Sequence, residues 1–369
     1  MMRIQNIQLF TKALPIVGGP YTMSRVTLNE ITTTIVRIES DTGLVGWGEV
    51  APLGPTYQPA HALGAVAAIK EMAPHLIGAP AHQPLTVMRL MNGLLEGHNY
   101  AKAAIDIALW DLTGKHYGAR VCDLLGGAEQ NRLPAYYAVG IGAPDEVAKI
   151  VSDKIDMGYK RIQIKVGGRN VATDIDVVRA AWDVCKGRAS LVADPNRGML
   201  AAQAKALSLA CADIPFSFEQ PCNTMDEIAS IRSQIVHPII VDESTESLHD
   251  VLRAIEMGIC DGFGFKVTRL GGLTNMMAVR DVAASRAMPH TVEDSWGGDI
   301  VSAAILHLAA TVEPRLLDCV WTAGNYIEEH YDPENGIKMK DGYFDVPTGV
   351  GLGINPSEDR IGRMVASFD

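Results

Sequence analysis

Lys165 ends a short segment, RIQIKVGG (161–168), in which apolar residues alternate with Arg161, Gln163 and Lys165. Alternation with a period of two predicts a β-strand with one apolar and one polar face. The lysine, just before Gly167 and Gly168, places an ammonium group where the chain leaves the sheet. Such a group can accept or donate a proton if its surroundings bring its pKa towards neutrality.

Similar segments along the chain also end in ionisable or aromatic side chains. These residues are Asp194 and Asn196 in SLVADPN, Glu219 in FSFEQP, Asp242 and Glu243 in IIVDES, Lys266 in DGFGFKV, Glu293 and Asp294 in PHTVED, and Trp321 in RLLDCVW. If the segments are parallel strands of one barrel, their C-terminal ends meet at the rim where chemistry takes place in that fold. The sequence therefore predicts one polar site assembled from most of the strands.

Three carboxylates, Asp194, Glu219 and Asp242, would converge from successive strands. Uncompensated, they would repel one another and take up protons. A divalent hard cation relieves that repulsion, and an all-oxygen ligand set suits Mg²⁺, one ion per subunit. The alternative is that each carboxylate caps the following helix or pairs with an arginine.

Two lysines, Lys165 and Lys266, lie on predicted strands two and six, on either side of the three acidic strands. A nearby cation lowers the pKa of an amine, so each lysine could work as a base near neutral pH. Together they could remove a proton from one face of a carbon and return it to the other. The alternative for either lysine is a salt bridge to the carboxylates.

The elements that must position these residues fall into three parts. From Leu133 onward, short strands alternate with helical stretches such as DEVAKIVSDKIDMG, which predicts an α/β fold, a (β/α)8 barrel of the triosephosphate isomerase (TIM) type. An open doubly wound sheet is the alternative, but no G-x-G-x-x-G follows the first strand. We expect an α+β capping domain at 1–125, the barrel at 126–325, and a C-terminal segment at 326–369 that returns to the cap.

Within the predicted cap, two features have a defined place. ITTTIVRIES and GLVGWGEV read as the strands of a hairpin around Asp41-Thr42-Gly43. The loop IVGGPYTM (16–23) is expected to close over the substrate, since Gly18 and Gly19 allow a hinge.

Composition excludes several function classes. The 369 residues carry a formal net charge of −11, which argues against sequence-independent binding to nucleic acid or to an anionic membrane surface. No stretch is long and apolar enough for a signal peptide or a membrane span. The six cysteines are scattered without a C-x-x-C pair, so we expect reduced thiols and a cytoplasmic protein.

The motifs IQIKVGG, VADPN, FEQP, VDES and GFGFKVTRLGGLTN, in this order and at barrel spacing, resemble the enolase superfamily in its mandelate racemase and muconate lactonizing enzyme branch. The resemblance covers essentially the whole chain. It implies that Asp194, Glu219 and Asp242 bind Mg²⁺ and that Lys165 and Lys266 form the acid/base pair. The shared step is removal of a proton α to a carboxylate, with the metal stabilising the enediolate.

Two positions depart from the pattern of the branch. Gln163 stands where the first lysine of a Lys-x-Lys motif is usual, and Pro195 lies between Asp194 and Asn196, where a small residue is commoner. Loss of the first lysine removes a positive neighbour of Lys165, so more of the task of lowering its pKa falls on the metal. We expect the ligand Asp194 to be retained.

Within the branch, the chain is most similar to the hydroxyproline-betaine 2-epimerases, and next to the cis-3-hydroxy-L-proline dehydratases. Stretches such as GPTY, GHNYAKAAIDIA and PHTVEDSWGGDIVSAA carry this similarity. A quaternary ammonium is held by aromatic faces and a carboxylate, which Trp321, Tyr57 and Asp294 could supply. The candidate substrate-binding residues are Tyr57, Gln163, Asp294 and Trp321, with Asn196, Glu243, Glu293 and Trp296 as weaker candidates.

The sequence leaves three reactions open for a small-molecule carboxylate. The first is 2-epimerisation of hydroxyproline betaine or proline betaine by Lys165 and Lys266, which would make the enzyme an isomerase. The second is dehydration of cis-3-hydroxy-L-proline at the same site, which would make it a lyase. The third, from a different class, is a Schiff-base lyase that uses Lys266. By resemblance we also expect a homo-oligomer.

Overall fold

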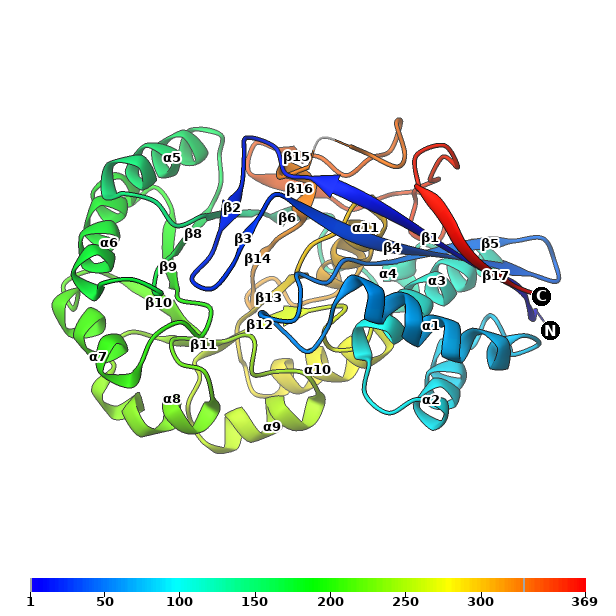
Figure 1. The fold of residues 1–369 in the computed structure, drawn as a ribbon, viewed down its shortest axis with the longest axis horizontal. Coiled ribbons are helices and arrows are strands. Elements are labelled where there is room, and N and C mark those ends of the chain that lie inside the picture. Colours follow the sequence, from blue (N-terminus) through cyan, green and yellow to red (C-terminus); the bar gives the residue numbers. More distant parts are fainter. Residues whose placement is uncertain (1, 328) are drawn as a thin grey trace.

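Eight parallel strands form a nearly closed barrel in the computed structural model, which describes residues 2–327 and 329–369 (Figure 1). The strands are hydrogen-bonded in chain order, and a parallel bridge between Ala135 and Val320 connects the two ends of the sheet. They are β7 (Tyr136–Val139), β8 (Arg161–Lys165), β9 (Ser190–Asp194), β10 (Phe216–Glu219), β11 (Ile239–Val241), β12 (Gly262–Lys266), β13 (His290–Glu293) and β14 (Leu317–Val320). The predicted barrel is confirmed, and the open sheet is excluded.

Helices cover the outside of the barrel, as Figure 1 shows. They are α5 (Pro144–Asp156), α6 (Val171–Cys185), α7 (Ala201–Ala210), α8 (Met225–Ile231), α9 (Leu248–Glu256), α10 (Leu273–Ser285) and α11 (Asp299–Ala309), with 3₁₀ turns at Arg232–Gln234 and Ala323–Asn325. Side chains of Asn170, Thr224 and Ser247 accept backbone N–H bonds at the starts of α6, α8 and α9. Such caps fix where each helix begins, and hence how long each loop at the rim can be.

Strand β8 differs from the half-exposed strand that its alternation predicts, because all five of its residues are buried. Its polar face points into the barrel, where Arg161, Gln163 and Lys165 are all buried. The parallel register pairs Lys165 on β8 with Asp194 on β9. The polar period therefore marks the barrel interior rather than a solvent-exposed face.

A separate N-terminal domain of strands and helices packs beside the barrel (Figure 1). Its sheet has the order β17-β1-β4-β5, and the predicted hairpin is β4 and β5, with Gly43 at φ +79° in the turn. The elements are β1 (Ile4–Pro15), β2 (Tyr21–Thr22), β3 (Thr27–Leu28), β4 (Glu30–Ser40), β5 (Val45–Val50), α1 (Ala62–Leu76), α2 (Pro84–Leu94), α3 (Asn99–Tyr117) and α4 (Val121–Leu124). Helix α3 packs directly on β5, because a Cβ atom at Gly48 would lie 1.8 Å from the Ala104 carbonyl oxygen.

The strands of the C-terminal segment join two different sheets. β17 (Arg363–Phe368) pairs antiparallel with β1 and completes the sheet of the cap, which brings the two chain termini together (Figure 1). The hairpin of β15 (Met339–Lys340) and β16 (Tyr343–Asp345) instead pairs with β6 (Arg132–Pro134), just before the first barrel strand. The exact division of the chain at residues 125 and 325 remains a prediction.

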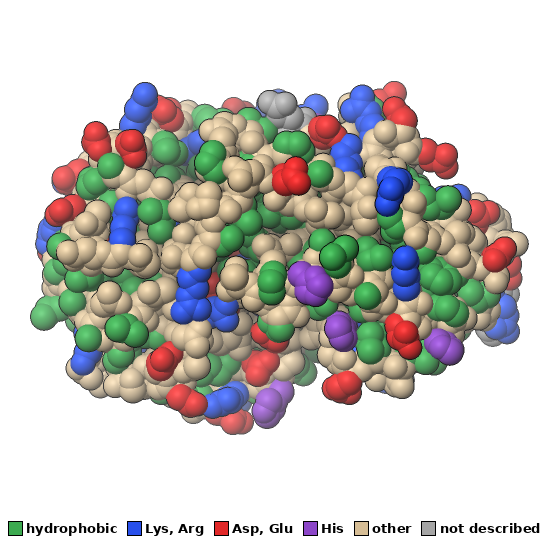
Figure 2. Space-filling view, in the orientation of Figure 1, with side chains coloured by type: hydrophobic (Ala, Val, Ile, Leu, Met, Phe, Trp, Pro, Cys, Tyr) green, Lys and Arg blue, Asp and Glu red, His purple; other side chains and the backbone are tan. Residues whose placement is uncertain are grey.

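Charged side chains of both signs are interspersed over the face seen in Figure 2, without an extended basic tract. Among the helices of residues 2–327 and 329–369, none has the length and hydrophobicity that crossing a bilayer requires. All six cysteines are free thiols, and five of them are buried.

A buried carboxylate joins the two domains. Asp106 on α3 accepts a hydrogen bond from the Thr274 backbone N–H at 3.0 Å and another from the Thr274 hydroxyl, so a residue of the cap closes the N-terminus of barrel helix α10. Gly272 permits this approach, because a Cβ atom there would lie 2.4 Å from Asp106 Oδ2. Burial raises the pKa of Asp106 to about 7, although the bonds from Thr274 and Leu273 oppose the shift.

The Asp106→Asn variant is expected to lose part of the pH dependence of stability. The native state keeps a proton on Asp106 that the unfolded chain releases near its ordinary pKa of 3.8, so wild-type stability falls as the pH rises towards about 7. The slope from this one group is about 1.4 kcal/mol per pH unit. Urea unfolding of both proteins from pH 4 to 8 should show a difference that changes with pH, and parallel profiles would contradict the assignment.

Candidate functional site

A small cavity of about 40 Å³ lies at the C-terminal ends of the barrel strands, beneath the cap. Twelve of the residues singled out from sequence line it, namely Tyr57, Gln163, Lys165, Asp194, Asn196, Glu219, Asp242, Lys266, Glu293, Asp294, Trp296 and Trp321. Glu243 does not line the cavity but accepts a hydrogen bond at 3.0 Å from Asn196, which does. The predicted site residues are thus brought together in one place.

Lys165 and Gln163 both donate to the first predicted metal ligand. The Lys165 ammonium pairs with Asp194 Oδ2, and the Gln163 amide donates to the same oxygen. The Gln163 amide also donates to Glu219 Oε1 at 3.1 Å, so it bridges two carboxylates. A neutral amide here holds the two acidic groups in place without the charge that a lysine would add.

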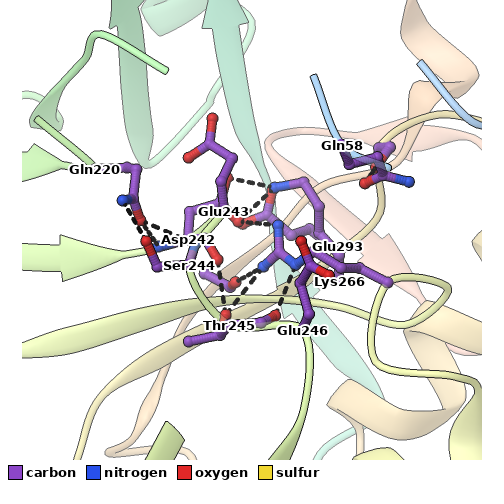
Figure 3. Close-up of polar contacts among 12 residues, drawn as sticks. Gln58, Gln220, Asp242, Glu243, Ser244, Thr245, Glu246, Lys266 and Glu293 are labelled. Atoms are coloured by element: carbon purple, nitrogen blue, oxygen red, sulfur yellow. Dashed lines mark hydrogen bonds and ion pairs between the residues drawn. The ribbon is translucent and has the colours of Figure 1, made fainter. Parts of the chain in front are cut away.

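Asp242 pairs with several side chains, Lys266 among them (Figure 3). Lys266 Nζ lies 2.8 Å from both of its oxygens, Arg269 Nη1 lies 2.7 Å from Oδ1, and the Tyr57 hydroxyl donates to Oδ2 at 3.1 Å. Gln220, whose backbone has φ +34°, accepts the Asp242 backbone N–H at 3.0 Å. Tyr57 comes from a cap loop, so this carboxylate connects the cap to the barrel.

Glu219 is held from the inner end of the barrel by Arg161, whose side chain is fully buried. Arg161 Nη2 lies 3.0 Å from Glu219 Oε2, and Nη1 lies 2.9 Å from Asp318. The guanidinium also lies over the ring of Tyr136, whose hydroxyl donates to Glu293 Oε2 at 2.6 Å. Because one oxygen of Glu219 is tied to Arg161, the other faces the cavity and Gln163.

The donor set fits a divalent cation. Around the cavity, six buried carboxylates face four buried basic side chains, an excess of two formal negative charges; these groups are Asp194, Glu219, Asp242, Glu243, Glu293 and Asp294 against Arg161, Lys165, Lys266 and Arg269. Three buried oxygens there, Gln163 Oε1, Asn196 Oδ1 and Glu243 Oε2, have no hydrogen-bond partner. Unpaired buried oxygens beside excess negative charge are what a hard cation compensates.

In this structure the carboxylates do not converge on one metal-binding position. Among the described residues, no three His, Cys, Asp or Glu side chains are grouped closely enough to hold a metal ion. The contacts above give the reason, since lysine, arginine and amide donors occupy the carboxylate oxygens. Binding of Mg²⁺ would require Asp194 and Asp242 to give up part of their pairing with Lys165 and Lys266.

Burial and neighbouring charges shift the pKa values of the acidic and basic groups around the cavity. Burial, with Asp194 as a further cause, raises the pKa of Glu219 well above its usual value, and burial beside Asp242 raises that of Glu243 to about 8. Burial opposes the charged form of both lysines, but Asp194 beside Lys165 and Asp242 beside Lys266 outweigh it, so both pKa values lie above the usual range. Without a cation, therefore, both ammonium groups are held charged by the carboxylates.

An aromatic wall made of Tyr21, Trp296 and Trp321 lines part of the cavity. The Trp296 and Trp321 rings lie 5.7 Å apart, and Tyr21 lies 5.8 Å from Trp296. Asp294 is fixed beside them, because it accepts bonds from the Thr268 backbone N–H at 2.7 Å and from the Ser295 backbone N–H at 2.6 Å. Burial raises the pKa of Asp294 to about 6. A carboxylate beside aromatic faces suits a cationic group.

Several residues of the site were not singled out from sequence. Tyr21 and Met23 line the cavity from the loop that was expected to close over it, and Tyr136 lines it from the first barrel strand. Arg269 is buried three residues after Lys266, in KVTRLGG, and this spacing is its only signal in the sequence. Tyr326, 5.4 Å from Trp321, comes from the C-terminal segment and has no local pattern that marks it.

Two family models match the chain. Residues 5–126 match the mandelate racemase / muconate lactonizing enzyme N-terminal domain, and residues 146–360 match the enolase C-terminal domain-like family. The chain is 37% identical to the cis-3-hydroxy-L-proline dehydratase of Roseibium aggregatum over 100% of both chains. It is 28% identical to the L-Ala-D/L-Glu epimerase of Clostridium acetobutylicum, over 84% of this chain and 87% of that one.

A solved structure is similar over the full length. The crystal structure of an enolase superfamily member from Roseovarius nubinhibens ISM, complexed with magnesium, superposes with a TM-score of 0.95 and is 32% identical, with 100% of both chains covered. That protein binds magnesium within the same architecture.

Proposed function

The chain belongs to the enolase superfamily, in its mandelate racemase and muconate lactonizing enzyme branch, and on this premise we propose that it removes the proton α to the carboxylate of a small cyclic amino acid. Asp194, Glu219 and Asp242 would hold Mg²⁺ in this proposal. When bound, the cation would supply a Lewis acid that stabilises negative charge developing on the substrate carboxylate.

One observation carries the proposal. Lys165 and Lys266 lie on strands separated by β9, β10 and β11, which end at or just before Asp194, Glu219 and Asp242, and all five side chains line one cavity. A substrate carboxylate directed at the acidic side chains would place its α-carbon between the two lysines. Each lysine would then reach a different face of that carbon, where it could hold or move a proton.

We favour dehydration of cis-3-hydroxy-L-proline as the outcome. The relative that is 37% identical over the whole of both chains is named for this reaction. One lysine would take the α-proton, the C3–O bond would break, and the electron pair of the C–H bond would form the C2–C3 double bond. The departing hydroxide would leave as water after a protonated lysine gives it a proton. Asp294 would accept hydrogen bonds from the ring N–H groups.

Epimerisation at the same carbon is the second candidate, and the aromatic wall favours it. A quaternary ammonium has no N–H to donate and is held by ring faces and a carboxylate, which Trp321, Tyr57 and Asp294 supply inside the cavity. Here the second lysine would return a proton to the opposite face of the α-carbon. Sequence first suggested this betaine reaction as the main one, but the relative at 37% identity supports dehydration more strongly.

A Schiff base at Lys266 is less consistent with the geometry. The amine must be neutral to attack a carbonyl group, yet Lys266 Nζ lies 2.8 Å from Asp242 and 3.2 Å from Glu293. A Schiff-base mechanism would require that borohydride trap a covalent adduct on Lys266 in the presence of substrate, and that EDTA leave the activity unchanged.

The test is an NMR assay in D₂O with Mg²⁺-loaded protein and three substrates, cis-3-hydroxy-L-proline, hydroxyproline betaine and proline betaine. We expect cis-3-hydroxy-L-proline to lose its α-proton signal and its hydroxyl group, giving a ring-dehydrated product. Appearance of a deuterated 2-epimer from a betaine alone would make the enzyme an epimerase. If no α-proton exchanges in any of the three compounds while Mg²⁺ is bound, the choice of substrate class is wrong.

A further inference from the structure

Two cap segments reach over the mouth of the barrel, and both are fastened at the same residue. One is the hairpin β2–β3, which extends from the cap to the barrel strands in Figure 1. The other is the loop 53–58, which carries Tyr57. Arg197 follows the loop Asp194–Asn196 directly and lies between the two segments.

The side chain of Arg197 holds the Tyr57 loop. Its Nη2 donates to the backbone carbonyl of Tyr57 and lies 3.5 Å from that of Thr56. The position of Tyr57 matters to the site, because its hydroxyl donates to Asp242 and its ring lines the cavity.

The backbone of Arg197 holds the hairpin. Arg25, exposed in the turn of β2–β3, donates from Nη2 to the Arg197 carbonyl at 3.2 Å. The hairpin lies directly on the backbone of the barrel loops, since a Cβ atom at Gly168 would be 2.3 Å from the Ser24 carbonyl and one at Gly198 would be 2.7 Å from Ser24 Cβ. Side chains at either glycine would keep the hairpin off the barrel.

Arg197 itself has φ +65°, a left-handed conformation that a non-glycine residue adopts at a cost. Its N–H donates to the Gln220 carbonyl at 3.0 Å, which holds this conformation from the residue that follows β10. Arg197 therefore keeps a strained backbone close to the predicted metal ligand Asp194. One cap segment is bonded to its side chain and the other to its carbonyl, which indicates a role in holding both segments.

We propose that Arg197 is a positioning residue that fastens both cap segments over the cavity, the Tyr57 loop through its guanidinium and the β2–β3 hairpin through its carbonyl. The two fastenings are separable, since they use different atoms of one residue. Tyr57 then reaches Asp242 only while the guanidinium holds its loop. This proposal goes beyond the reaction and holds for any substrate of the cavity.

Hydrogen–deuterium exchange of the full-length protein, read by mass spectrometry without substrate, tests the proposal. Arg197→Gly removes the guanidinium while tolerating φ +65°, so it should raise exchange in peptides that cover residues 53–58 about tenfold or more, as expected for loss of a charged hydrogen bond. Exchange in residues 21–28 should change little, because the carbonyl remains. Arg197→Lys keeps one charged donor and should restore much of the protection of residues 53–58.

Matched variants separate the two fastenings. Arg25→Ala should raise exchange in residues 21–28 and leave residues 53–58 protected. Arg179→Ala removes an exposed pair with Asp213 on the outer surface and should alter neither segment. If Arg197→Gly leaves residues 53–58 as protected as in the wild type, or opens the whole barrel equally, the proposal is wrong. Because no substrate is used, this result is independent of the proposed reaction.

Discussion

Replacing Lys165 or Lys266 with arginine is expected to lower net turnover of the substrate by at least about a thousandfold, within the range that general acid–base groups supply. Arginine keeps the positive charge beside Asp194 or Asp242 but does not release its proton near neutral pH. The arginine variants are therefore the informative ones. Alanine would remove a buried charged partner from Asp194 or Asp242 and destabilise the fold by up to about 3–5 kcal/mol.

The pattern of α-proton exchange in D₂O should distinguish the roles of the two lysines. If each lysine serves one face of the α-carbon, each variant should lose exchange from its own face while the remaining lysine still exchanges a proton of one enantiomer. Lys149→Arg on the outer helix α5 is the control and should behave as the wild type. Exchange at the wild-type rate in either active-site variant would remove that lysine from the mechanism.

The barrel and the chemical groups of the site could be predicted from sequence because both follow local rules. Strand segments of period two that end in an ionisable residue locate Lys165, Asp194 and Lys266 at the rim once the strands are parallel. The rule fails where burial is set by distant parts of the chain. Strand β8 alternates like a half-exposed strand, yet it is wholly buried, because its polar face lies inside the closed barrel.

The residues that sequence did not reveal act across long chain separations. Arg161 reaches Glu219 over 58 positions, and Tyr136 reaches Glu293 over 157. The sequence around Arg161 and around Tyr136 gives no indication of these partners. Gln163 is a related case, because only the structure shows that its amide donates to both Asp194 and Glu219. A single amide there keeps two acidic side chains together where the branch usually has a lysine.

Glu219→Gln is expected to weaken Mg²⁺ binding by about a hundredfold or more. Changes to groups that merely support a metal ligand cost about 10- to 100-fold in affinity, and this change removes the charge of a ligand itself. The new amide also directs an N–H group at Arg161 or at Gln163, both of which donate to Glu219 in the wild type. The measurement is calorimetric titration of the apoprotein with Mg²⁺.

Thermal stability gives an independent readout of the same change. At a Mg²⁺ concentration 100 times the wild-type Kd, binding should stabilise the wild type by about 2.7 kcal/mol, whereas a hundredfold weaker variant should gain only about 0.4 kcal/mol. In EDTA, without bound metal, the substitution has two opposing effects on the free energy of unfolding. The buried Arg161 loses a charged partner, but the repulsion of Glu219 by neighbouring carboxylates such as Asp194, which adds to burial in raising the pKa of Glu219, is relieved.

Asp318→Asn is the matched control, because Asp318 is the other partner of Arg161 and is 37% exposed at the far end of the barrel. It should leave the Mg²⁺ affinity within a few-fold of the wild type, since Arg161 keeps its contact with Glu219. If Glu219→Gln binds Mg²⁺ as tightly as the wild type while Asp318→Asn also does, Glu219 is not a ligand. The excess of two negative charges around the cavity would then have to be balanced by protons, for which Glu219 and Glu243, with their raised pKa values, are the first candidates.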